Sequence, residues 1–159
     1  MTKNTNFMVL NVDSLSPQTY FPTFCPTYAA SLYSSFKKRI GVELDESMVK
    51  ICAKLKVPGE FITADIRKCA STVVPESDVI IMNNVFEYFM EAKEELDCWK
   101  TIFEFSKKGQ LFVMVPGLED TFERLEGSLC RNSVIHDITR KVRKVGGDDD
   151  KDIHVYVVE

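Results

Sequence analysis

Polar side chains with the chemistry to hold or react with a ligand follow several short apolar runs that predict β-strands. They are Asp13, Glu43, Asp65 and the pair Asn83 and Asn84. In an open α/β sheet the carboxyl ends of parallel strands share one edge, and ligands bind along it. A carboxylate at such a strand end can accept hydrogen bonds from both hydroxyls of a ribose. A solvated edge also carries polar groups, so the coincidence over several strands is what supports a binding site.

The sequence around Glu43 is the most informative of these places. A short apolar strand at residues 40–42 ends on Glu43, and a helix follows at once with Asp45 placed to cap it. The helix shows one apolar stripe at the spacing i, i+3, i+4 and i+7, formed by Met48, Ile51, Cys52 and Leu55. Strand, carboxylate, turn and helix are the local design by which nucleotide-binding folds hold a sugar.

The remaining apolar patterns predict the elements that must position these side chains. Further strands are expected at residues 7–13, 61–65, 77–82, 110–115 and 153–158, and further helices at 28–38, 86–105 and 118–129. Residues 67–74 are ambiguous, with Pro75 separating them from the next strand, and 134–145 are helical or partly strand. Loops are expected at 14–26 and 146–151, which are rich in proline and in glycine with aspartate, respectively.

Strands that alternate with helices predict a single α/β domain, a mostly parallel sheet with helices on both faces. The last strand follows a polar, hairpin-like loop instead of a crossover helix, so we expect it to run antiparallel. If it inserts beside the strand at 110–115, the arrangement argues against a dinucleotide-binding fold.

Composition restricts the partners. The net charge of −4 gives no general attraction for nucleic acid or an anionic membrane. No apolar run approaches the roughly 18 residues that span a bilayer, and the polar start lacks a signal-peptide layout, so we expect an intracellular, cytoplasmic protein.

Cysteine and histidine predict no metal site. The five cysteines are widely spaced and form no Cys-x-x-Cys pair, which argues against zinc and for reduced cysteines packed in the core. The two histidines, His136 and His154, have no partner visible in the sequence, and a structural reading is favoured over a catalytic one.

Four segments in this order resemble the class I S-adenosylmethionine-dependent methyltransferases. They are GVELD at 41–45, TADI at 63–66, SDVIIMNNVFEYF at 77–89, and KGQLF at 108–112, continuing to Pro116. The resemblance covers roughly residues 29–158. Order and spacing carry it, because no single segment is specific. It implies a Rossmann-like methyltransferase fold with S-adenosyl-L-methionine as cofactor.

The resemblance also implies cofactor-binding roles. Glu43 matches the acid that binds the ribose hydroxyls. Asp65 matches the acceptor for the adenine amino group, and Ile66 donates its backbone N–H to the ring. Asp13, followed by Ser14, stands where the motif after the first strand would start.

For the acceptor side, Asn83 and Asn84 match the segment beside the transferring methyl group, where amide oxygens orient an amine. Phe86 and Tyr88 are candidate aromatic residues of the substrate pocket, although packing of the expected helix at 86–105 accounts for them as well.

One family feature is missing. The family has a glycine-rich turn after the first strand, whereas this chain has no glycine before Gly41. Residues 1–26 are therefore interpreted as a degenerate or replaced N-terminal segment, and 27–159 as the methyltransferase-like domain.

Three functions stay open on the sequence. They are a methyltransferase acting on an unidentified acceptor, an inactive methyltransferase-fold protein that binds or regulates a partner protein, and another Rossmann-type nucleotide binder. The absent Gly-x-Gly-x-x-Gly weakens the third, which also leaves Asp65 and the asparagine pair unexplained.

Overall fold

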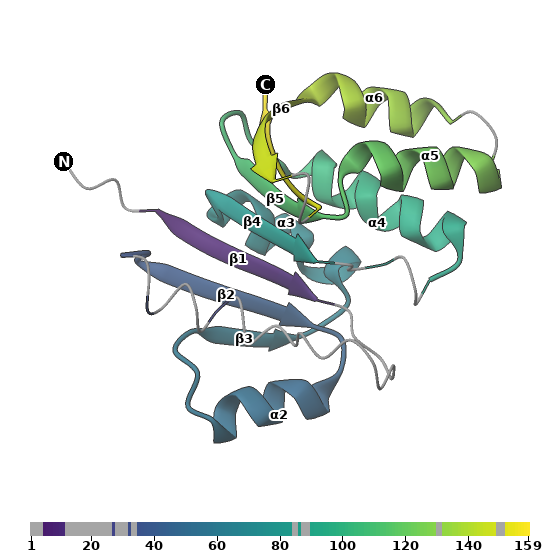
Figure 1. Cartoon of the computed structure of the whole chain (residues 1–159). Helices are drawn as coiled ribbons and strands as arrows, with labels where there is room; N and C mark the ends of the chain where they lie inside the picture. The colour runs from purple at the N-terminus through teal and green to yellow at the C-terminus, as the bar shows by residue number, and fades with distance from the viewer. Residues whose placement is uncertain are drawn as a thin grey trace.

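A computed structural model describes residues 5–11, 27, 32, 35–83, 86, 90–129, 132–148 and 152–159 of the chain. These residues form a seven-stranded sheet in the order β3-β2-β1-β4-β5-β7-β6 (Figure 1). Five neighbouring strands are parallel, and β7 runs antiparallel to both β5 and β6. The strands are β1 Asn6–Asn11, β2 Lys38–Glu43, β3 Glu60–Thr63, β4 Val79–Asn83, β5 Leu111–Val115, β6 Val142–Asp148 and β7 Ile153–Val158.

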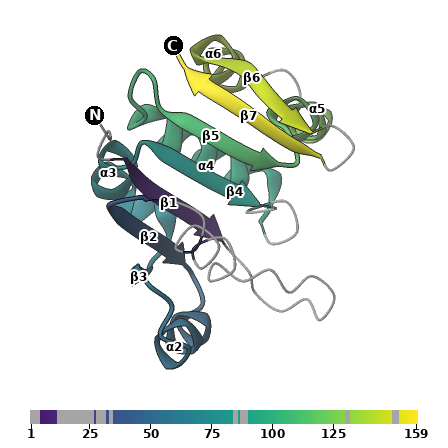
Figure 2. The same cartoon turned by 60° about the vertical axis from the view of Figure 1, so that its left-hand side comes forward.

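The described helices are α2 Glu46–Lys54, α3 Ile66–Glu76, α4 Ala92–Glu104, α5 Leu118–Leu129 and α6 Ser133–Lys141. Crossovers between parallel strands are almost always right-handed. The chain moves outward from β2 to β3 through α2, and in the opposite direction through α3 and α4. This reversal puts α2 on the other face of the sheet from α3 and α4. Figure 2 shows α4 crossing behind β4 and β5.

The core lies between the sheet and the group α3, α4 and α5. One row of side chains runs across five strands in register and is at most 1% exposed: Met8, Ile40, Ile80, Phe112 and Tyr156. Trp99 and Phe103 of α4 pack onto this layer. Cys52 and Cys98 are buried, as predicted, and burial raises the pKa of the Cys98 thiol to about 12. Continuous apolar rows of this kind hold the strand ends in fixed positions.

The predicted fold class is confirmed, including the antiparallel last strand beside Leu111–Val115. The proposed boundary at residue 26 stays a prediction, although β1, which precedes it, lies in the middle of the sheet. The loop expected at 14–26 and most of the helix expected at 28–38 fall outside the described residues, and Lys38 already belongs to β2. In the part of the chain that is described, no helix is long and apolar enough to cross a bilayer.

The prediction of a helix at 86–105 is wrong at its start, because α4 begins at Ala92. Phe86 lies at a bend, and its ring meets Trp99 edge-on at 5.3 Å. Phe86 is therefore apolar because it packs in the core, and its spacing to the next apolar residues does not mark a helix. The ambiguous segment at 67–74 is helical and belongs to α3, and Pro75 lies in the last turn of this helix, between the segment and β4.

The loop predicted at 146–151 is also wrong in part, because β6 includes Gly146, Gly147 and Asp148. Gly147 has a φ of +150°, and a Cβ built there would lie 2.2 Å from the carbonyl oxygen of Ile153. The glycine thus allows close strand approach, a reading that sequence alone does not separate from a loop.

Candidate functional site

The carboxyl ends of the parallel strands bring Glu43 and Asn83 into one row. Glu43 is paired with Asn11 in β1, and Leu10 beside it is paired with Met82, the residue before Asn83. Two strand spacings therefore separate Glu43 from Asn83, about 10 Å. The register of the sheet brings these two predicted site residues to the same edge.

Glu43 is a buried acid, 1% exposed, at the last position of β2. Its Oε1 accepts a hydrogen bond from the N–H of Asp45 at 3.1 Å, and its carbonyl oxygen accepts one from Ala64 at 3.0 Å. Asp45 in turn caps α2 by accepting from the N–H of Ser47 at 2.7 Å, and hydrogen bonds from Ser47 lower the pKa of Asp45. The strand end, turn and helix start thus fix one carboxylate.

Asp65 is the N-cap of α3, and its carboxylate is held by Arg67. Its Oδ1 accepts from the backbone N–H of Arg67 at 2.9 Å, and the guanidinium reaches Oδ2 at 2.6 Å. Hydrogen bonds from Arg67 lower the pKa of Asp65, so this carboxylate stays ionised. Ile66 is the first residue of α3, where the helix offers no acceptor for its N–H.

Between these two strand ends lies a small apolar hollow. It is lined by Leu10, Val42, Leu44, Ala64, Asp65, Ile66 and Met90. Apolar walls with one carboxylate match the faces and the exocyclic amine of an adenine. The hollow measures about 10 Å³, which is room for roughly one water. An adenine would enter only if exposed Leu44 or half-buried Met90 moved.

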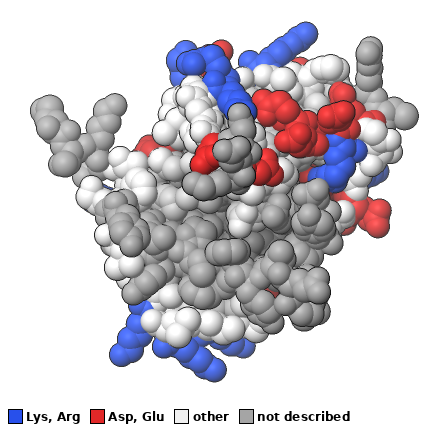
Figure 3. All heavy atoms as spheres, in the orientation of Figure 1, with Lys and Arg blue, Asp and Glu red and all other residues white. Residues whose placement is uncertain are grey.

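A larger cavity, about 360 Å³, lies away from this edge, between α5, α6 and the β6–β7 pair. Leu118, Phe122, Ile135 and Tyr156 form its apolar part, and Glu119, Glu123 and Glu126 add acid. Figure 3 shows acidic side chains gathered where α5 lies in Figure 1. Of the sequence-predicted site residues that the structure describes, none lines this cavity.

The remaining predicted site residues differ in exposure, and three of them are not among the described residues. Asn83 is half-buried at the end of β4. Phe86 is 1% exposed and packed in the core, so its role in substrate binding stays a prediction. Asp13, Asn84 and Tyr88 fall outside the described residues.

A second buried acid, Glu95, has a packing role instead. It is 1% exposed, and both of its oxygens accept from Arg124 of α5, at 2.6 and 2.8 Å. The indole N–H of Trp99 also donates to it at 3.2 Å. Because its oxygens are satisfied by groups within the helical layer, Glu95 joins α4 to α5 and lies apart from the strand-end row.

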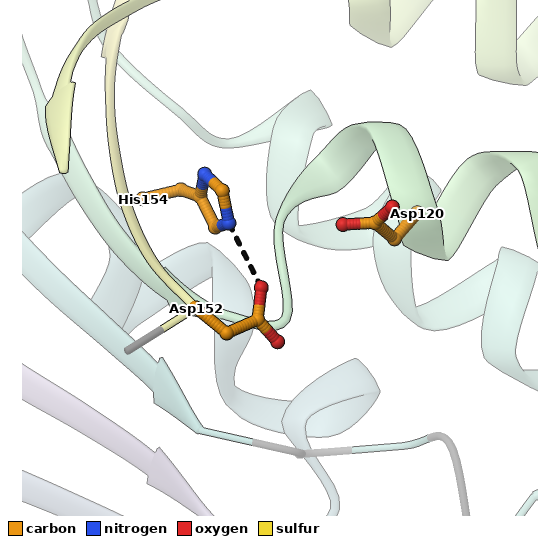
Figure 4. A group of neighbouring side chains, drawn as sticks. All are labelled: Asp120, Asp152 and His154. Atoms are coloured by element: carbon orange, nitrogen blue, oxygen red, sulfur yellow. Dashed lines mark hydrogen bonds and ion pairs between the residues drawn. The ribbon is translucent and has the colours of Figure 1, made fainter. Parts of the chain in front are cut away.

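Sequence reasoning missed a group at the start of β7. His154, which was interpreted as isolated, lies beside Asp152 and Asp120 (Figure 4). Asp152 is visible as an i, i+2 neighbour, but Asp120 is far away in the sequence. His154 lies beside Asp120 because β7 inserts antiparallel to β5, next to the start of the helix that follows β5.

Comparison with known proteins gives a fold. No family model and no curated protein matches the chain. Among solved structures, N-methyltransferase NodS from Bradyrhizobium japonicum WM9 is 13% identical, with a TM-score of 0.62 over 97% of this chain and 85% of that chain. The same enzyme in complex with S-adenosyl-l-homocysteine is 12% identical, with a TM-score of 0.60 over 97% of this chain and 78% of that chain.

An rRNA methylase from Streptococcus thermophilus is 12% identical, with a TM-score of 0.52 over 98% of this chain and 87% of that chain. At such identities the likeness concerns the course of the backbone, and the strand order and the antiparallel β7 agree with it. The chain therefore has the fold of the class I S-adenosylmethionine-dependent methyltransferases.

Proposed function

We propose that this chain binds S-adenosylmethionine at the strand-end row of Glu43 and Asn83 and transfers a methyl group to a nucleophilic acceptor. The observation that carries the proposal is the buried Glu43 carboxylate at the end of β2, in one row with Asn83 and within a sheet of this strand order. Burying a carboxylate is costly, so its retention at a ligand-binding edge favours a binding role.

Each residue at the strand ends would have a separate role in binding. Glu43 would accept hydrogen bonds from the ribose, while Ile66 and the apolar walls of the hollow would hold the base. A carboxylate has about four acceptor sites, so Asp65 could accept from the adenine amino group while bound to Arg67. When bound, the cofactor supplies a sulfonium methyl group. Asn83 would orient the acceptor, because this transfer needs alignment and exclusion of water more than a strong base.

Calorimetric titration with S-adenosylmethionine tests the proposal. We expect micromolar binding and a clear loss in Glu43→Gln, which keeps the shape and the acceptor for Asp45 but removes the charge. A hydrogen bond to a charged group is worth about 1.5–3 kcal/mol, so the affinity should fall roughly 10- to 100-fold. Glu46→Gln, an exposed acid of the first turn of α2, is the matched control and should bind as the wild type does.

Binding in the millimolar range or weaker that Glu43→Gln leaves unchanged would exclude the proposal. It would favour the second candidate, a methyltransferase-fold protein that binds or regulates a partner without activity. Specific observations support that candidate: Arg67 occupies the Asp65 carboxylate, the hollow is small, and no glycine precedes Gly41.

A further inference from the structure

Three side chains with metal-binding atoms converge at the start of β7. Asp120 lies in the first turn of α5, Asp152 immediately precedes β7, and His154 is its second residue. One ligand atom of each lies within 4.8 Å of those of the other two. Figure 4 shows the carboxylates and the imidazole directed toward a common space from two elements.

The imidazole is the fixed member of this group. The His154 side chain is 9% exposed, and its Nε2 lies 2.9 Å from Oδ1 of Asp152. The ring stacks on Tyr156 with centroids 6.5 Å apart. On another side it meets the backbone at Gly117, where a Cβ would come within 2.9 Å of the ring. Packing thus orients Nε2 before any ligand arrives.

The two acids are open to solvent, which gives an ion a path to the histidine. Asp120 is exposed, and the Asp152 side chain is 52% exposed. Ligand atoms around a metal at 2.0–2.2 Å stand about 3–4 Å apart, so a rotation of Asp120 would close the set.

A hydrogen-bonded His–Asp pair alone would account for His154 and Asp152 but not for Asp120. The start of α5 favours an acid near its N–H groups, yet this does not require the acid to face a histidine. Within the described residues, neither Asp120 nor Asp152 forms an ion pair with lysine or arginine. Two carboxylates this close repel each other, and a shared cation would remove that cost.

We propose that Asp120, Asp152 and His154 bind a divalent transition-metal ion such as Mn²⁺ or Zn²⁺. Two carboxylate oxygens and one imidazole nitrogen suit these ions, whereas the imidazole disfavours Ca²⁺ and Mg²⁺. His154 is paired with Met114, and Met114 with Met82, so the site lies at the same edge of the sheet as Asn83. Coordination of an acceptor oxygen there would rest on the proposed function, but binding of the ion does not.

The test is a Mn²⁺ titration of the whole chain, without cofactor, followed by NMR of the histidine ring protons. The chain has two histidines, and His136 on α6, 3.8 Å from Glu126, serves as the internal control. We expect Mn²⁺ to broaden the His154 signals first and His136 only in excess. Equal broadening of both, or broadening of neither, would overturn the proposal. Loss of cofactor binding would leave this result unchanged.

Charge-removing variants locate the ion. Asp120→Asn and Asp152→Asn are exposed changes that preserve shape, and each should weaken Mn²⁺ binding roughly ten-fold or more, since loss even of an outer partner costs that much. Glu123→Gln, exposed and one turn further along α5, changes the net charge equally and should leave the affinity unchanged. Unchanged affinity in both aspartate variants would overturn the proposal.

Discussion

Asp78 joins three strands through one residue. Its carboxylate accepts from the N–H of Asn6 at 2.8 Å and pairs with Lys107 at 3.0 Å. Its backbone N–H donates to Asn6, and its carbonyl oxygen accepts from Leu111. The starts of β1 and β5 are therefore held at the residue before β4. The hydrogen bond from the N–H of Asn6 lowers the pKa of Asp78 below its ordinary value of 3.8, and the interaction with Lys107 lowers it by a smaller amount.

This pKa predicts a pH dependence of stability. The unfolded chain takes up the proton first as the pH falls, so the stabilisation from ionised Asp78 is present above the ordinary pKa and is lost as the pH falls through the folded pKa. Urea unfolding of the wild type and Asp78→Asn should differ by a constant free energy down to about pH 5, and the difference should shrink below about pH 4. A difference that stays constant or grows in acid would contradict this assignment.

Residue types alone predicted Glu43 at a strand end, because the acid directly follows an apolar run. They could not predict that Arg67 would hold Asp65, since the two residues meet through the turn into α3. They also failed for His154, whose neighbour Asp120 comes from another element. Local pattern identifies a side chain, whereas its partners depend on the geometry of a turn or on contacts between distant elements.

At the scale of elements, helix starts position the candidate site. α2 and α3 each begin on an aspartate that follows a strand, and each cap accepts from the N–H two residues on. The Asp45 cap was readable from sequence because the apolar stripe after it was clear. The start of α4 was not, because Phe86 continued the apolar period while packing into the core.

The α2 cap gives a testable prediction. Asp45→Ala should lower the free energy of unfolding by about 1 kcal/mol, whereas Asp45→Asn should cost much less because asparagine caps equally well. Asn132→Ala removes the corresponding cap of α6 and should cost a similar amount. Chemical denaturation measures all three. Equal losses in the alanine and asparagine variants of Asp45 would show that the carboxylate does not act as the cap.

At the scale of the molecule, the sheet has outer strands that resist pairing with other chains. β3 is four residues long. β6 is longer, but it carries exposed Arg143 and Lys144 and a register shift next to Lys144. Charged side chains and bulges are the usual means of protecting an edge.

Removing this protection should make the chain self-associate. The double variant Arg143→Val and Lys144→Val should form dimers or larger species as the concentration rises, as measured by sedimentation velocity. Arg140→Val with Lys141→Val makes the same change in charge on the last turn of α6, outside the strand, and should stay as the wild type. If both double variants associate equally, net charge and not the strand edge controls association.

The insertion of β7 between β5 and β6 also divides the sheet into two parts that meet at one pair of strands. The five parallel strands, which carry Glu43 and Asn83, include the pairing of β1 with β4, which joins residues 72 positions apart. β6 precedes β7 in the chain but reaches the sheet only by pairing with it. The hairpin of β6 and β7 is therefore attached to the rest of the sheet through the β5–β7 pairing alone, which joins residues 40 to 46 positions apart. Separation of β7 from β5 would therefore displace Asp152 and His154, while the strands that carry the proposed cofactor edge would keep their pairing with one another.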